Sequence, residues 1–286
     1  MITLSIKGIY FMLTTLEIQD GDPYWWNSPD IWVVPGNDPY GPPAQPTAGE
    51  PAFVWARVHN KGDLNVSSAC VKFYWSNPAL GVLRSISHLI GLAYVDLMEG
   101  ETKEVLCVVP WIPEIVNNGH ECLIAEIIHP LDPLPSPLPD AFEPHLYHQI
   151  AQKNITVIEV EDSTIVLPIM IATPTRKEKK LILTTVIGGE VDDVSKKQLG
   201  LNRYNVAKDA NILVGLSSKQ SCEITGDRRI KIDLNKGQRK AVYLKIKATK
   251  LEVGSYVLLN VISNDGKQND GGLSYVLIRR GDVKTK

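Results

Sequence analysis

The chain has 286 residues, of which 44% are hydrophobic and 22% are charged, and its formal net charge is −2 at pH 7. These values exclude wholesale disorder, and no apolar run reaches the ~18 residues that a membrane-spanning helix needs. At roughly 150 residues per domain, the length predicts two domains, each able to bury its own core.

Charged and aromatic residues are divided unevenly along the chain. Through residue 160 there are 7 Lys and Arg against 18 Asp and Glu, whereas residues 161–286 carry 23 against 14. The six Trp lie within the first 111 residues, and the six His lie before residue 150. This asymmetry predicts an acidic domain over 1–160 and a basic domain over 161–286, joined near residues 160–164.

The first residues call for a targeting check, because Lys7 precedes the apolar run 8–13 in the manner of a signal peptide. No small-residue cleavage site follows, and polar residues interrupt the apolar stretch. We therefore expect a β-strand within 1–22. Because the sequence has no clear signal peptide, it does not predict the cellular compartment of the protein.

The first half alternates apolar and polar residues in short runs bounded by turn residues. This pattern predicts strands at 52–59, 70–75, 104–109, 120–128 and 154–160. In the first of these runs, Trp55, Arg57 and His59 share one face. Two Pro-rich stretches, 35–46 and 129–139, are expected to be loops, because each Pro removes a backbone donor from a sheet.

The second half repeats the β pattern with more lysine. Strands are predicted at 164–172, 180–187, 210–216, 229–234, 240–248, 255–263 and 273–279. Hairpin turns are expected at 235–237 and 264–266, and the one short helix between 191 and 209. This many strands in about 120 residues is typical of an immunoglobulin-like β-sandwich.

Segments of the first half also follow, in order, the strand motifs of a known module. They are 28–33, 54–62, 71–78, 111–113, 120–125 and 149–157. Together they make residues 25–160 resemble the bacterial cell-adhesion-related (CARDB) immunoglobulin-like modules, whereas the second half resembles only a generic immunoglobulin-like module. The resemblance implies an all-β fold of two tandem immunoglobulin-like β-sandwiches, an accessory or adhesive role at a surface or outside the cell, and no shared catalytic residues.

Aromatic side chains beside polar residues are the candidates for a binding site. Tyr24, Trp25 and Trp26 precede Asn27, and Tyr40 lies in the first Pro-rich stretch. Such rings can stack on a carbohydrate or anchor a protein partner. The alternative is that they cover the edge of the sandwich as part of its core.

Histidines suggest a second, weaker candidate site. The potential metal ligands are His120, His129, Asp132, His145 and His148. They form no recognised metal signature, so we expect hydrogen-bonded or surface histidines, and we expect no metal and no cofactor.

The sequence carries no motif of nucleophilic or metal-dependent hydrolysis, neither Gly-x-Ser-x-Gly nor His-Glu-x-x-His. Cys70, Cys107 and Cys122 lie in apolar strand patterns and are expected to be free, buried thiols, with a Cys70–Cys122 bridge as the alternative. Despite basic runs in the second half, no nucleic-acid-binding motif is present. We therefore expect neither an enzyme nor a nucleic-acid partner.

These patterns favour a non-enzymatic structural or interaction protein, a partner-binding or self-associating subunit of a bacterial surface or extracellular assembly such as a filament. Opposite domain charges would steer the acidic half of one molecule to the basic half of another. A carbohydrate-binding adhesin is the first alternative, and a metal-dependent enzyme built on the histidines is the second.

Overall fold

The structure of the protein, a computed structural model, describes residues 14–77, 79–114, 121–173, 178–224 and 227–279. These residues form strands β1 to β18, the 3-10 turn η1 (Arg84–Ile86) and the six-residue helix α1 (Asp193–Gln198). The prediction of an all-β fold is confirmed. No helix in these ranges is long and apolar enough to cross a membrane.

Two facing sheets form an N-terminal sandwich. The first contains β1 (Leu16–Glu17), β2 (Ile31–Pro35), β3 (Ala52–Asn60) and β7 (Thr102–Leu106), and the second contains β6 (His88–Leu97), β4 (Val66–Ser76), β8 (Cys122–Ile128) and β9 (Ile150–Lys153). Every second residue of β3 is buried, as its alternating sequence predicts. Val54, Val58, Phe73 and Ile127 belong to the core between the sheets.

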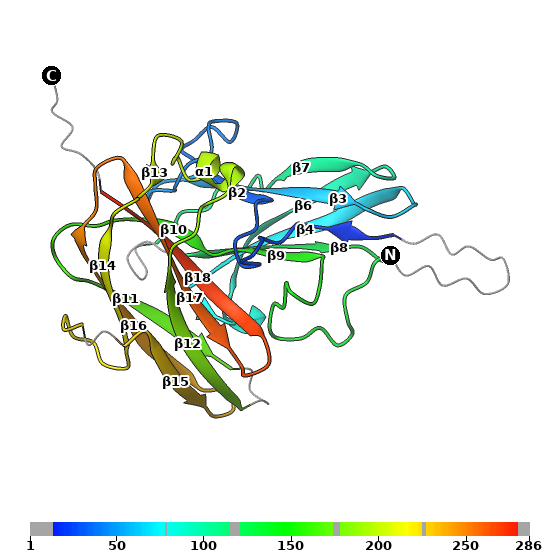
Figure 1. The fold of residues 1–286 in the computed structure, drawn as a ribbon. Coiled ribbons are helices and arrows are strands. Elements are labelled where there is room, and N and C mark those ends of the chain that lie inside the picture. The colour runs from blue at the N-terminus through cyan, green and yellow to red at the C-terminus, as the bar shows by residue number, and fades with distance from the viewer. Residues whose placement is uncertain (1–13, 78, 115–120, 174–177, 225–226, 280–286) are drawn as a thin grey trace, which may run out of the picture.

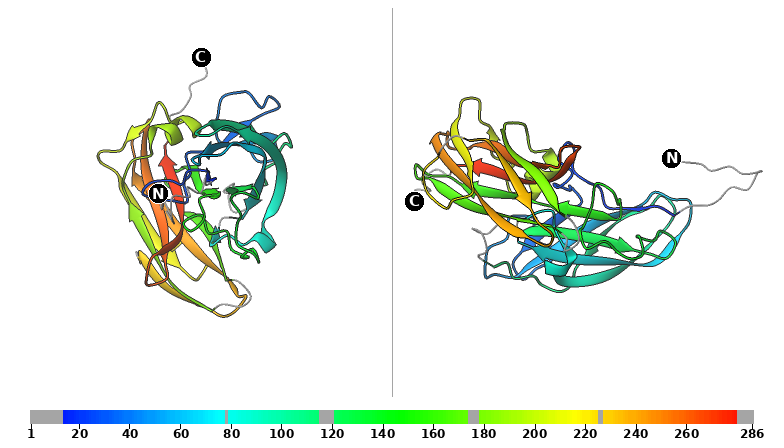
Figure 2. Two further views of the ribbon diagram at one scale, coloured as in Figure 1. Left: turned by 90° about the vertical axis from the view of Figure 1, so that its right-hand side faces the viewer. Right: turned by 90° about the horizontal axis from the view of Figure 1, so that it is seen from below.

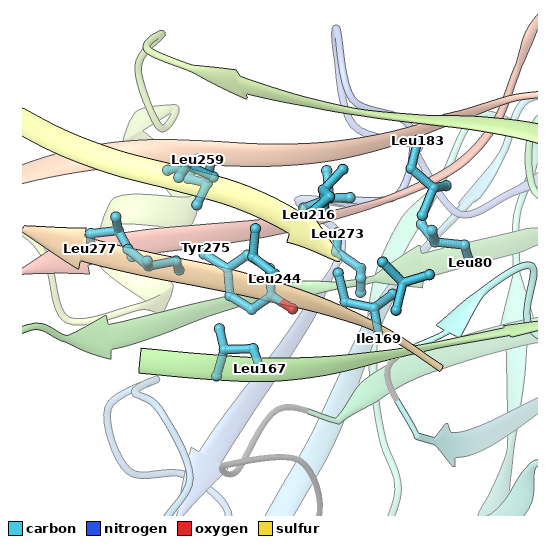
Figure 3. Packing of buried hydrophobic residues seen from close by; sticks show 14 of the residues in the cluster. Leu80, Leu167, Ile169, Leu183, Leu216, Leu244, Leu259, Leu273, Tyr275 and Leu277 are labelled. Atoms are coloured by element: carbon cyan, nitrogen blue, oxygen red, sulfur yellow. The ribbon is translucent and has the colours of Figure 1, made fainter. Parts of the chain in front are cut away.

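A second pair of sheets forms a C-terminal sandwich. One contains β10 (Ile155–Glu159), β18 (Asn269–Ile278), β17 (Ser255–Asn264), β12 (Lys179–Ile187), β15 (Arg229–Leu234) and β13 (Asn205–Val206). The other contains β14 (Asn211–Ser217), β16 (Arg239–Lys250), β11 (Ile165–Ala172) and β5 (Ala79–Leu80). Leu167, Leu183, Leu244 and Leu259 point into the core between them (Figure 3).

The two sandwiches lie side by side (Figures 1 and 2), and the C-terminal sandwich includes two strands from the first 160 residues. β9 ends in the N-terminal sandwich at Lys153, and β10 begins at Ile155 as the parallel partner of β18. β5, from within the N-terminal half, pairs in parallel with β11 and places Leu80 in the C-terminal core (Figure 3). The chain thus changes sheet at Asn154, ahead of the predicted join at 160–164.

Several predicted elements differ from the structure in extent. The closing run 154–160 is divided between the two sandwiches, and β7 ends at Leu106 rather than at residue 109. Within 1–22, only Leu16–Glu17 is a strand in the described part, and residues 1–13 lie outside it. Strands β5, β6 and β13 were not predicted, and β2 and β9 overlap segments 28–33 and 149–157, which only the resemblance marked. Both Pro-rich stretches run outside the strands over nearly all of their length, as expected.

Candidate functional site

A seam of buried side chains holds the two sandwiches together, and Trp26 is its largest member. The Trp26 side chain is 1% exposed and lies flat against Gly272 of β18, where an added Cβ would come within 2.2 Å of the indole ring. Its Nε1 donates a hydrogen bond to Ser274 Oγ at 3.1 Å. The Asn154 side-chain amide donates to the Gly272 carbonyl at 2.7 Å. Trp26 is therefore a buried contact between the halves, which agrees with the alternative of a core residue and removes Trp26 as a ring that stacks on a ligand.

A buried lysine attaches α1 to the other side of the seam. Lys153 Nζ donates to the Ser28 carbonyl at 3.0 Å and to Gln198 Oε1 at 2.6 Å. Gln198 in turn donates from Nε2 to the Pro29 carbonyl at 2.8 Å. Burial lowers the pKa of Lys153 to about 8, and the nearby charge of Asp192 opposes this shift. Gln198, in the last turn of α1, is thus fixed to the N-terminal sandwich.

Above the seam, two adjoining cavities open between the sandwiches. One, the acidic cavity, has a volume of about 630 Å³, and the other, the aromatic cavity, has about 530 Å³. They share Arg57, Asp193 and Val194 as lining residues. The acidic cavity is lined by six carboxylates, Asp20, Asp22, Asp30, Glu190, Asp192 and Asp193. We take this cleft as the candidate functional site.

A ladder of rings lines the aromatic cavity. Trp32 and Trp55 are direct neighbours on β2 and β3, and their rings stack 5.9 Å apart at an angle of 8°. Tyr40 packs edge-on against Trp55 at 5.7 Å. Trp55 Nε1 donates to the Pro39 carbonyl at 3.0 Å, so the Pro-rich loop holds this ring in place. Trp32 is only 8% exposed whereas Tyr40 is 76% exposed, so Tyr40 is the ring that a ligand can reach.

A buried carboxylate fixes the one cation at the junction of the cavities. Asp30 Oδ1 accepts from Arg57 Nη1 at 3.1 Å, and its Oδ2 lies 2.6 Å from His59 Nε2. Arg57 Nη2 donates to Glu104 at 3.0 Å, and the guanidinium carbon lies 5.4 Å from the Trp32 ring centre. Arg57 is held by charge-assisted bonds and a cation–π contact, so it presents a positioned donor to the cleft.

Asp20 gives the acidic cavity a carboxyl group of unusual pKa. Its Oδ1 is buried and has no hydrogen-bond partner among the described residues. Burial, with a smaller effect from the charge of Glu17, raises the pKa of Asp20 to about 7. Near neutral pH this carboxyl is therefore partly protonated and can act as a hydrogen-bond donor.

The predicted aromatic residues do not share one site. Tyr24, Trp25 and Trp26 contact one another, with ring centres 5.2 Å apart for Tyr24–Trp26 and 5.6 Å for Trp25–Trp26. Tyr24 lines the acidic cavity, and Trp25 packs on His145 at 5.1 Å. Tyr40 lies alone of the four in the aromatic cavity.

Sequence reasoning missed Trp32, Trp55 and Arg57 as members of the site. The shared face of Trp55 and Arg57 on the predicted strand 52–59 was the available signal. The pairing of Trp32 with Trp55 depends on the register of β2 against β3. That register cannot be read from either strand by itself.

The candidate metal ligands lie in separate contacts. His148 Nε2 is 3.2 Å from Asp132 Oδ2, and that hydrogen bond raises the pKa of His148. His129 Nε2 lies 3.2 Å from the Ser67 carbonyl, and His120 is outside the described residues. Within the described ranges, no three His, Cys, Asp or Glu side chains are grouped so as to hold a metal ion.

The alternative of a Cys70–Cys122 disulfide is wrong in this structure. All four cysteines are free. In the β4–β8 pairing, Cys70 lies opposite Ile128 and Cys122 opposite Ser76, so the two thiols are at opposite ends of the strand pair. Burial also raises the pKa of Cys122, which makes it an unreactive thiol.

Comparisons with known proteins do not identify a family. No family model matches the chain, and no curated protein matches it. A β-D-glucoside glucohydrolase from Trichoderma reesei is 11% identical over 42% of this chain and 17% of that chain, with a TM-score of 0.22. CBD12 from CALX1.2 is 12% identical over 80% of this chain and 93% of that chain, with a TM-score of 0.22. The calcium binding domain CBD12 of CALX1.1 is 14% identical over 74% and 73%, with a TM-score of 0.17. Scores this low carry no argument about function, and the resemblance to CARDB modules stays a prediction.

Proposed function

We propose that the chain is a non-enzymatic, self-associating interaction protein, built from immunoglobulin-like sandwiches and serving as a subunit of a bacterial surface or extracellular assembly. One observation carries the proposal: the ion pairs among the described residues each join two groups of the same half of the chain. They include Arg57–Asp30, Arg84–Glu126, Lys179–Asp270 and Lys250–Asp209.

The opposite net charges of the halves, −11 through residue 160 and +9 beyond it, can thus attract other molecules. Among the described residues, the seam is held by contacts of Trp26, Lys153 and Asn154, and no ion pair crosses it. Because the halves are fixed side by side, the acidic surface of one molecule is free to meet the basic surface of another. Complementary surfaces of this kind steer association.

Sedimentation velocity over a range of protein concentrations tests this function. We expect concentration-dependent association at about 20 mM salt that weakens at about 500 mM, because salt screens exposed charges. A chain that stays monomeric at both salt concentrations contradicts the proposal.

A second candidate, carbohydrate binding, is favoured by the exposed ring of Tyr40 in the aromatic cavity. Glu104 and Lys197 line the same cavity and supply an acceptor and a donor for sugar hydroxyls. Binding of soluble saccharides, followed by tryptophan fluorescence, is expected to be lost in Tyr40→Ala. Tyr94→Ala is the matched control, because Tyr94 is 65% exposed and lies on β6, outside the residues that line this cavity. Equal binding by both variants, or none by the wild type, removes this candidate.

A further inference from the structure

Strand β6 is an edge of its sheet. Within the described residues it pairs with β4 alone. Leu89, Leu92 and Tyr94 are exposed, and the register with β4 is unbroken from Gly91 to Val95. Beyond this stretch, Lys103 Nζ donates to the Asp96 carbonyl at 2.7 Å, and Asp96 Oδ1 accepts from Ser68 N at 2.6 Å. Natural edge strands are usually guarded by lysine, proline, a bulge or an inward charge, so the part of β6 open to another strand runs from Gly91 to Val95.

Strand β15 is an edge of the C-terminal sandwich with the opposite charge. It pairs with β12 alone in the described part of the chain. Its exposed positions are Arg229, Lys231 and Asp233, while Ile232 and Leu234 face the core. Arg228, immediately before the strand, is also exposed. Lys240 Nζ donates to the Asp233 carbonyl at 2.6 Å, whereas the exposed charges at Arg229 and Lys231 repel a second basic strand and attract an acidic one.

We propose that β6 of one molecule pairs antiparallel with β15 of a second copy, which names the surface used in the self-association proposed above and rests on it. β6 runs antiparallel to β4, and β15 runs antiparallel to β12. Both strands are therefore the outer members of antiparallel pairs, and a further strand can add to either edge in antiparallel orientation. In such a pairing, directly opposite residues lie on the same face of the joined sheet.

One register brings two exposed pairs into favourable contact. With Tyr94 opposite Lys231, Asp96 lies opposite Arg229, while Leu92 lies opposite Asp233. The first pair is a cation–π contact and the second joins opposite charges across the strands. A contact between two β6 strands instead brings the acidic turn at Glu99 close to another acidic half, which is unfavourable.

Because β6 and β15 are different surfaces, the contact is heterologous. Each molecule offers one β6 and one β15, so a third copy can add to a pair of molecules. Such a contact propagates into an open chain unless the rotation closes a ring.

A charge exchange tests the contact. Asp96→Lys places a lysine opposite Arg229 of the next molecule, and Arg229→Glu places a glutamate opposite Asp96. Because like charges then meet across the contact, each single variant is expected to self-associate at least about tenfold more weakly than the wild type. The double variant Asp96→Lys/Arg229→Glu, and an equimolar mixture of the two single variants, are expected to associate again. Asp63→Lys is the matched control, because it makes the same charge change at an exposed residue outside β6.

Circular dichroism and sedimentation velocity of the five proteins separate the outcomes. If Asp96→Lys or Arg229→Glu, folded like the wild type, associates as well as Asp63→Lys does, the β6–β15 contact is wrong while self-association stands. If the single variants fail and neither the double variant nor the mixture recovers, the register is wrong and the contact is rejected. A wild type that is monomeric at every concentration overturns the proposed function together with this contact.

Discussion

Replacing Gly272 by alanine tests whether Trp26 holds the two sandwiches together. The new Cβ would lie 2.2 Å from two atoms of the Trp26 ring, so the indole must move. Forcing one methyl group into a packed core costs about 1–3 kcal/mol. Displacing the ring also breaks the bond from Nε1 to Ser274 Oγ, worth about 1 kcal/mol. We expect the free energy of unfolding to fall by about 2–4 kcal/mol in total.

Equilibrium unfolding in guanidinium, followed by tryptophan fluorescence and by circular dichroism, measures this loss. Gly41→Ala is the control, since a Cβ there meets its nearest atom at 3.4 Å and, as at Gly272, the backbone has no positive φ. Adding Trp26→Leu to Gly272→Ala removes the clash, so the double variant is expected to lose less than the sum of the two single losses. The reasoning is refuted if Gly272→Ala is as stable as Gly41→Ala.

Two further predictions concern buried charges. Asp30→Ala leaves Arg57 and His59 without their shared carboxylate. We expect the free energy of unfolding to fall by about 3 kcal/mol. This is the low end for breaking a buried ion pair, because Arg57 is partly exposed. An unchanged midpoint of chemical denaturation contradicts this. The second prediction concerns Lys153, because burial lowers its pKa from 10.5 to about 8. Between pH 8 and pH 10.5 the unfolded chain therefore binds more protons at this lysine than the folded chain does. Its contribution to the free energy of unfolding consequently rises with pH. The wild type is therefore expected to gain about 2 kcal/mol relative to Lys153→Met between pH 7.5 and pH 10, and a constant difference between the two proteins would show that the lysine is not desolvated.

The strands that could be predicted from the sequence are those with one apolar face and one polar face. In β16, Val242, Leu244 and Ile246 are buried, and the alternating Tyr243 and Lys247 are partly exposed, whereas Lys245 between them is buried and donates from Nζ to the Glu223 carbonyl. A sequence with this alternation allows one orientation against the core. Strand β6 escaped detection because Leu89, Leu92 and Tyr94 are exposed while Ile90 and Val95 pack on the core, so apolar residues occupy both faces. Alternation cannot mark a strand whose outer face is also apolar.

The parts of the site that sequence reasoning could not find depend on pairings between distant segments. Leu80 enters the C-terminal core through a two-residue strand that pairs with β11, and no local pattern marks so short a strand. Whether Trp26 stacks on a ligand or on the backbone is decided at Gly272, near the other end of the chain. The run 24–26 was a candidate binding site in the sequence, and the structure places Trp26 against Gly272 and Ser274 of the same chain.

The polar character of the seam has a consequence for assembly. Lys153, Asn154 and Ser274 donate directional hydrogen bonds to Ser28, Gly272 and Asn260, and buried polar contacts of this kind favour one arrangement over others. An apolar seam of equal area would allow the sandwiches to slide. With their orientation fixed, β6 and β15 keep a constant relation to each other, so each β6–β15 contact would repeat the same rotation from one molecule to the next. Loosening the seam is therefore expected to shorten assemblies even where both edge strands are intact, and Gly272→Ala, which touches neither edge, is the variant in which to look for that effect.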